Sequence, residues 1–132
     1  MTSSPRVSLL ALCLALLAAP ADAAAGAGSA SPLGSLPATF TGMLPCADCT
    51  GIRYQIDLLP KAAFVQRTTY LRSGMDASSY ALGSWSISAD GHTLVLDGGR
   101  GNVGYWSIEG AKTLRKLDSK GQPIESTLPY EL

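Results

Sequence analysis

Residues 45–58 read PCADCTGIRYQIDL, and the second half of this stretch decides the fold. From Ile52 to Leu58 every second residue is apolar and the residues between are polar. This period of two is typical of a β-strand with one buried face. Cys46 and Cys49 come directly before it as a Cys-x-x-Cys pair. The sequence therefore predicts a strand over 52–58 that is entered through a short, cysteine-bearing loop.

Short segments with the same strand character continue downstream, separated by turn residues. Asp90-Gly91 is a strong hairpin signal, and no amphipathic helix of three turns is found anywhere in the chain. The predicted strands cover 52–58, 63–71, 80–88, 93–96, 104–108 and 113–117. We therefore predict an all-β fold, a small antiparallel up-and-down barrel of seven to eight strands, with a two-sheet sandwich as the alternative.

The N-terminus has the pattern of a secretory signal peptide over residues 1–23. Arg6 precedes an uncharged apolar run over 7–19, and Ala21-Asp22-Ala23 forms a cleavage site. The run is shorter than the roughly 20 residues that span a bilayer, so no transmembrane segment is expected in the mature chain. Cys13 lies in the middle of the run behind Leu12, which does not fit a lipid anchor.

A leader and one domain follow the signal peptide. Residues 24–37 are rich in Ala, Gly, Ser and Pro and predict a flexible leader, and 38–132 form the predicted barrel domain. The charges balance at 10 basic and 10 acidic residues without a basic cluster, which argues against nucleic acid as a partner. Export brings the cysteines into an oxidising compartment.

Three kinds of chemistry are open to Cys46 and Cys49. A structural or labile disulfide is favoured by export. Two thiolates also suit Cu(I), for which Met43 or Met75 could supply a thioether ligand. A thiol oxidoreductase needs the pair at a helix N-terminus, whereas a strand follows here, and Asp48 disfavours a thiolate.

Signals for catalysis are missing from the sequence, and we predict no catalytic residues and no enzyme. There is no G-x-S-x-G motif, and the carboxylates show no acid–base spacing. Tyr105 and Trp106 are neighbours in a predicted strand, so they point to opposite faces, and the outer one is a candidate contact for a partner protein. Ordinary core packing is the alternative for both.

The chain resembles the NlpE N-terminal domain family. The resemblance begins with the string TGMLPCADCTGI over 41–52 and continues through Gly83-Ser84-Trp85, residues 117–126 and Tyr130-Glu131-Leu132. It covers essentially the whole predicted domain, but only the first domain of the family. Relatives often place an Asp-Gly turn where this chain has Pro60-Lys61-Ala62-Ala63.

The resemblance implies a lipocalin-like barrel in the envelope of a Gram-negative bacterium, in the periplasm or associated with the outer membrane. It also implies a non-enzymatic role in envelope-stress sensing or copper tolerance, with an envelope protein as partner. Cys46 and Cys49 would then be the redox- or Cu(I)-responsive element. Two alternatives remain, a lipocalin-like carrier of a small apolar ligand and a structural interaction module stapled by the disulfide.

Overall fold

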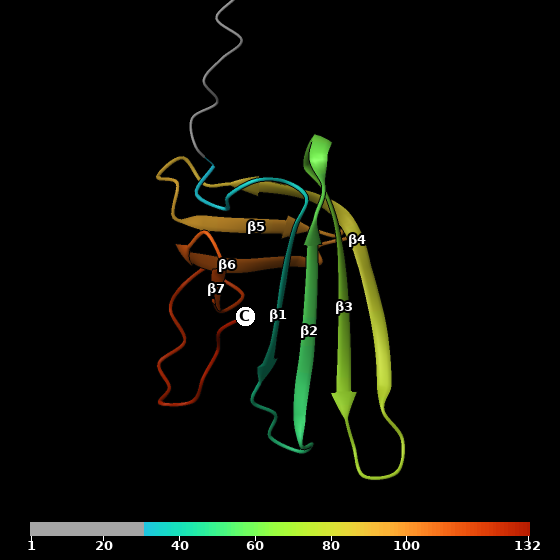
Figure 1. Ribbon diagram of the computed structural model, residues 1–132. Coiled ribbons are helices and arrows are strands. Elements are labelled where there is room, and N and C mark those ends of the chain that lie inside the picture. Colours follow the sequence, from blue (N-terminus) through green and yellow to red (C-terminus); the bar gives the residue numbers. More distant parts are fainter. Residues whose placement is uncertain (1–30) are drawn as a thin grey trace, which may run out of the picture.

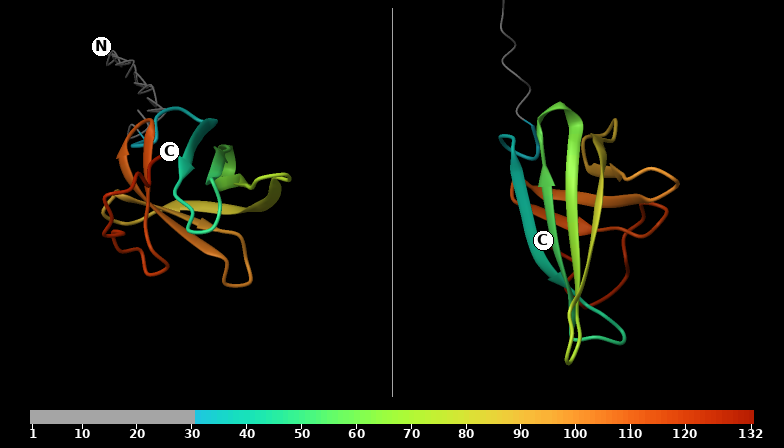
Figure 2. Two further views of the ribbon diagram at one scale, coloured as in Figure 1. Left: turned by 90° about the horizontal axis from the view of Figure 1, so that it is seen from below. Right: turned by 90° about the vertical axis from the view of Figure 1, so that its right-hand side faces the viewer.

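The computed structural model describes residues 31–132 as one antiparallel sheet that curls into a nearly closed barrel (Figures 1 and 2). The only helical element of the described part is η1, a single 3₁₀ turn over Pro60–Ala62. Seven strands run in the order β1-β2-β3-β4-β5-β6-β7, which is the predicted meander. Their bounds are β1 Ala38–Leu44, β2 Gly51–Leu58, β3 Ala63–Leu71, β4 Ala77–Ile87, β5 Thr93–Asp97, β6 Val103–Gly110 and β7 Thr113–Lys116.

Strand β4 divides the sheet into two halves. Its first part, from Ala77 to Ser84, pairs with β3, and its last part, from Ser84 to Ile87, pairs with β5. In Figure 1 the long strands β1–β3 and the first part of β4 stand upright, and β5 and β6 run across them. Gly83 lies at this corner, where the end of β5 approaches its backbone closely. The residues of β4 before the corner therefore have a strand neighbour on one side only within the described chain.

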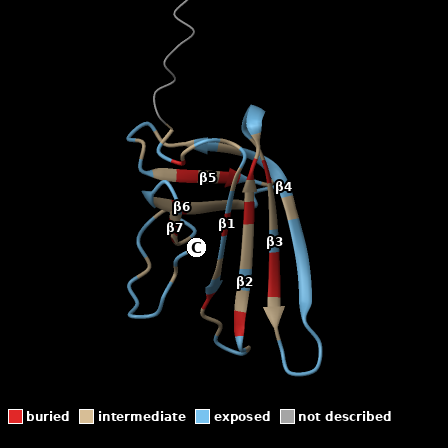
Figure 3. Cartoon of the chain, viewed as in Figure 1, coloured by how far each residue is buried: buried red, intermediate tan, exposed pale blue. Residues whose placement is uncertain are grey.

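The core lies between the two halves of the sheet. The alternating residues of β2 give it Ile56 and Leu58, each 0% exposed, as the period of two predicts. Trp106 is the largest fully buried side chain, and Tyr54 meets it edge-on with ring centroids 5.6 Å apart. Figure 3 shows buried segments on β1, β2, β3 and β5, whereas β4 is largely exposed.

The C-terminal segment closes most of the gap between the first and the last strand. The backbone of Lys116 donates to the carbonyl of Tyr130 at 2.7 Å, and that of Leu132 donates to the carbonyl of Leu114 at 2.8 Å. On its other side the segment lies against β1, where a Cβ at Gly42 would be 2.6 Å from the carbonyl oxygen of Glu131. Residues 130–132 thus pair with the edge of β7 as a short eighth strand would, and they cover that edge.

The barrel domain begins earlier than the sequence indicates. The predicted leader ends at residue 37, yet Leu33 is only 1% exposed and belongs to the core cluster. A buried leucine in a Gly- and Pro-rich stretch has no periodic neighbours, so the pattern does not reveal it. The predicted signal peptide and Cys13 lie outside the described residues. From residue 31 onward no helix combines the length and the apolar character that a membrane span requires.

Candidate functional site

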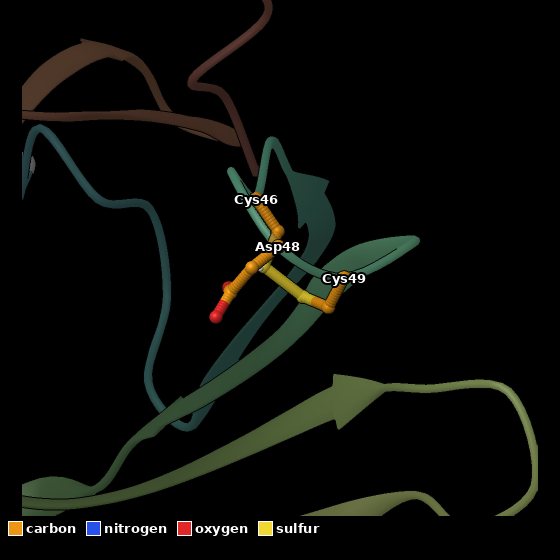
Figure 4. Close-up of side chains that lie close together, drawn as sticks. All are labelled: Cys46, Asp48 and Cys49. Carbon is orange, nitrogen blue, oxygen red and sulfur yellow. Dashed lines mark hydrogen bonds between the residues drawn. A yellow bond between two sulfur atoms is a disulfide. The ribbon is translucent and has the colours of Figure 1, made fainter.

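The cysteine loop joins β1 to β2 at one end of the barrel. Cys46 and Cys49 form a disulfide with their Cα atoms 5.3 Å apart (Figure 4). Pro45 and both cysteines are half-buried, while Ala47 and Asp48 between them are exposed. The two residues in the centre of the loop are therefore exposed to solvent, and the disulfide links the half-buried cysteines on either side of them.

Both sulfur atoms have an oxygen neighbour. The Sγ of Cys46 lies 3.5 Å from Oδ1 of Asp48, and the Sγ of Cys49 lies 3.4 Å from the carbonyl oxygen of Gly51. In the disulfide these are contacts only, because neither sulfur carries a proton. In the dithiol both sulfurs can donate weak S–H hydrogen bonds to these oxygens. After reduction, both S–H groups would thus have a hydrogen-bond acceptor within the loop.

An open hollow of about 590 Å³ lies beside the disulfide. It is lined by residues 47–50 of the loop and by Arg72 and Ser73, which follow β3. The backbone of Thr50 donates to the carbonyl of Leu71 at 3.0 Å, so the two connections are tied together. A conformational change in the cysteine loop would therefore alter the hollow, which is lined by both the loop and the β3–β4 connection.

The two methionines predicted as extra ligands lie in different surroundings. Met43, on β1, is 43% exposed, and its sulfur covers the backbone of Gly51, two residues after Cys49. Met75 is 81% exposed in the β3–β4 connection. The ligand atoms of Cys46, Asp48 and Cys49 lie within 4.8 Å of one another. Whether any of these residues binds a metal stays a prediction.

Tyr105 and Trp106 do point to opposite sides of β6. Trp106 is 1% exposed in the core, so it is not available as a partner contact. Tyr105 is half-buried, and its ring packs next to Gly121. A partner contact at Tyr105 stays a prediction.

A cavity between the two halves of the sheet contains one charged group that sequence reasoning missed, the ammonium group of Lys116. The cavity measures about 160 Å³, and its lining includes Tyr54, Trp106 and Lys116. Burial lowers the pKa of Lys116 against a small opposing effect of Asp118, and burial raises the pKa of Tyr54, with Tyr70 as a smaller cause. The signal for Lys116 was its position two residues after Leu114, which places a cation on the core face of β7.

A third hollow, of about 510 Å³, lies at the β1 side of the barrel between residues 33–41 and Leu132. It is lined by Leu33 and Phe40 together with polar backbone and the exposed Lys112. It shares no residue with the hollow beside the disulfide or with the interior cavity.

Residues 40–127 match the family model described as the NlpE N-terminal domain. The chain is 38% identical over 104 residues to the Escherichia coli protein named Lipoprotein NlpE. This alignment covers 78% of the chain and 43% of the relative, so the chain spans less than half the length of that protein.

Two solved structures have the same fold. The crystal structure of the Cpx pathway activator NlpE from Escherichia coli is 35% identical, with a TM-score of 0.58 over 72% of this chain and 48% of that one. The crystal structure of a putative lipoprotein from Shewanella oneidensis has a TM-score of 0.58 at 24% identity, over 71% of this chain and 87% of that one. At that identity the Shewanella structure supports the fold alone.

Proposed function

The chain belongs to the NlpE N-terminal domain family, and on that premise we propose that it is a non-enzymatic module that senses envelope stress. Its responsive element would be the Cys46–Cys49 pair. The periplasm is the proposed compartment, since an oxidising environment accounts for the disulfide. An envelope protein is the proposed partner, which would contact the loop over 44–51.

The position of the disulfide carries this proposal. It closes an exposed loop at the end of the barrel, and the hollow beside it is shared with Arg72 and Ser73. None of the loop residues from Cys46 to Thr50 belongs to the core cluster. Opening the disulfide would therefore alter the surface around the loop while the barrel stays folded.

The chemical step is thiol–disulfide exchange with a dithiol reductant. A thiolate of the reductant attacks one sulfur and cleaves the S–S bond, and a second thiolate then resolves the mixed disulfide. Cys46 and Cys49 each end as a thiol with one proton, and the reductant ends as a disulfide. An oxidant of the envelope reverses these two-electron steps. The switch therefore needs no catalytic residue of its own.

Copper is the second candidate stimulus, and the cluster of ligand atoms favours it. The ligand atoms of Cys46, Asp48 and Cys49 lie within 4.8 Å of one another, and the sulfur of Met43 lies over Gly51, so a reduced pair that keeps this loop conformation would share one soft ion. Asp48 is a hard oxygen donor and contributes little to Cu(I). An anaerobic titration of the reduced protein with Cu(I) against a competing chelator tests this. Binding of one ion that is lost in Cys46→Ser/Cys49→Ser supports the copper stimulus, and equal uptake by both proteins rejects it.

The proposed function is tested in Escherichia coli that lacks its own NlpE and carries a reporter of the Cpx pathway. The chain, the double variant Cys46→Ser/Cys49→Ser and the control Ala47→Ser are compared under copper and under a dithiol reductant. Ala47 is exposed between the cysteines, so its replacement changes the loop but keeps the disulfide. We expect the chain and the control to respond and the double variant, at equal abundance, to lose the response. An unchanged response in the double variant contradicts the proposal.

A further inference from the structure

The interior cavity brings two hydrogen-bond donors to one point. A Cβ at Gly104 would lie 3.8 Å from Nε1 of Trp106 and 3.9 Å from Nζ of Lys116. Gly104 has no side chain, so this point is open space inside the cavity. Trp106 and Lys116 are also direct cross-strand partners on β6 and β7. The register of these two strands therefore fixes the indole N–H and the ammonium group side by side.

The indole N–H of Trp106 has no acceptor. Its nitrogen is inaccessible to solvent and is the only buried side-chain nitrogen or oxygen without a partner among the residues that the structure describes. A buried donor left unpaired costs about 1–3 kcal/mol, so such groups in folded proteins ordinarily have a partner. The other tryptophan shows the usual arrangement, since Nε1 of Trp85 donates to the carbonyl of Leu59 at 3.0 Å.

Lys116 brings a positive charge to the same point. Its ammonium group donates to the carbonyl of Tyr105 at 3.4 Å and lies 5.0 Å from the centre of the Trp106 ring. No carboxylate forms an ion pair with it in residues 31–132, where the one salt bridge joins Arg115 to Glu131. Burial disfavours this charge and lowers the pKa of Lys116, so an anion in the cavity would compensate it.

The rest of the lining combines apolar side chains with the polar side chains of Gln66 and Asn102 and with Tyr54. Leu96 lies next to the point where the donors meet, with its Cβ 4.0 Å from the Cβ position of Gly104. Phe64, Ala81 and Val103 supply further apolar lining, and the exposed Asn102 marks the side that faces solvent. At about 160 Å³ the cavity is smaller than the pockets of roughly 300–1,000 Å³ that hold drug-sized molecules. It suits an anionic head group followed by a few carbon atoms.

We propose that this cavity binds the carboxylate of a small aliphatic acid, with Trp106 and Lys116 as the two donors and Phe64 and Leu96 against the carbon chain. A carboxylate neutralises the ammonium charge, and it accepts a hydrogen bond from the indole N–H once the side chains around that nitrogen move apart enough to admit an oxygen atom. The site shares no residue with the hollow beside the disulfide, and the proposal does not rest on the proposed function.

The indole resonances in a ¹⁵N-correlated NMR spectrum test the proposal directly. The chain is exported to the periplasm of a Gram-negative host, purified in the oxidised form and titrated with butanoate, butan-1-ol and inorganic phosphate. We expect butanoate to shift the indole N–H signal of Trp106 along a saturating curve that fits one site per chain. The signal of Trp85 should stay in place, because its N–H already has an acceptor.

Two variants and one control assign the effect to the site. Lys116→Met removes the charge at nearly equal volume. We expect this variant to bind butanoate at least about tenfold more weakly than the unchanged chain does. Gly104→Ala fills the open point without a clash, because the nearest atom to its Cβ is 3.8 Å away, and it should abolish the shift. The exposed Lys120→Met should change nothing.

Each other outcome overturns the proposal. An equal response to butan-1-ol indicates an apolar cavity without a role for the donors. An equal response to phosphate indicates a general anion site. The absence of any shift at millimolar butanoate indicates that water is the only occupant of the cavity.

Discussion

The backbone of Gly83 on β4 passes so close to the carbonyl oxygen of Asp97 on β5 that a Cβ at residue 83 would overlap that oxygen. This contact sits at the corner where β4 leaves β3 and begins to pair with β5. The close approach of the two halves of the sheet at this corner therefore depends on the absence of a side chain at residue 83.

Replacing Gly83 by alanine should lower the free energy of unfolding by about 1–3 kcal/mol, because backbone atoms have to move apart at the corner. Urea unfolding followed by tryptophan fluorescence measures the loss. The matched control is Gly98→Ala, where the nearest atom to the Cβ is the side-chain nitrogen of Asn102 at 3.1 Å, the end of a side chain that can rotate away. Equal stability of both variants would show that the corner yields easily.

The turn between β2 and β3 predicts a stabilising substitution. Lys61 and Ala62 have φ angles of 63° and 59°, in the left-handed region that disfavours residues with a Cβ. Asn-Gly suits two consecutive left-handed residues in a hairpin. Lys61→Asn with Ala62→Gly should therefore raise the free energy of unfolding by about 1 kcal/mol. Lys61→Ala, which keeps both strained positions, should bring no gain, and a destabilised double variant would contradict the account of this turn.

The disulfide should contribute modestly to stability because it closes a ring of only four residues. The loop-entropy relation gives roughly 2 kcal/mol for such a ring. Cys46→Ser/Cys49→Ser and the reduced chain should both remain folded, with a urea midpoint lowered by a similar amount. A double variant that is unfolded without denaturant would show that the disulfide is a structural staple, which contradicts its proposed role as a switch.

The turn after β7 predicts a stability change in acid. Backbone N–H groups of Gln122 and Lys120 donate to the carboxylate of Asp118 at 2.8 Å each and lower its pKa below the usual 3.8. The folded state thus holds this proton less tightly than the unfolded state. Its stabilisation is complete above about pH 4 and is lost as the pH falls through the lower, folded-state pKa.

Asp118→Asn keeps an acceptor oxygen but removes the charge, so its free energy of unfolding should fall less steeply below about pH 4 than that of the unchanged chain. Urea midpoints between about pH 5 and pH 2 measure the difference. Glu125→Gln is the control, since Glu125 makes no hydrogen bond within the described part of the chain. Parallel pH profiles for Asp118→Asn and the unchanged chain would contradict the role of the two backbone donors.

Much of the barrel follows from the alternation of side chains alone. The predicted segment 63–71 coincides with β3, and 52–58 differs from β2 by one residue. Strand β4 starts three residues before its predicted position, because Ala77, Ser78 and Ser79 show no apolar alternation. Backbone pairing with β3 makes this part a strand, and that pairing is not visible in the residues themselves.

The two candidate sites differ in how far the sequence reveals them. Cys46 and Cys49 are three residues apart, so their disulfide could be anticipated from spacing and export. The donors of the interior cavity come from two strands, and the open point between them depends on Gly104. Only the register of β6 with β7 brings Trp106 and Lys116 together. Side-chain patterns along one segment cannot show such a meeting.

A comparison of backbone amide NMR spectra of the oxidised and the reduced chain tests the central claim most directly. The account predicts chemical-shift changes confined to the loop over 44–51 and to residues 71–73, which share its hydrogen bond and its hollow. Signals of the buried Ile56 and Leu94 should stay in place. Spectra that differ only at the two cysteines, or throughout the barrel, would contradict a disulfide that controls one surface of a folded domain.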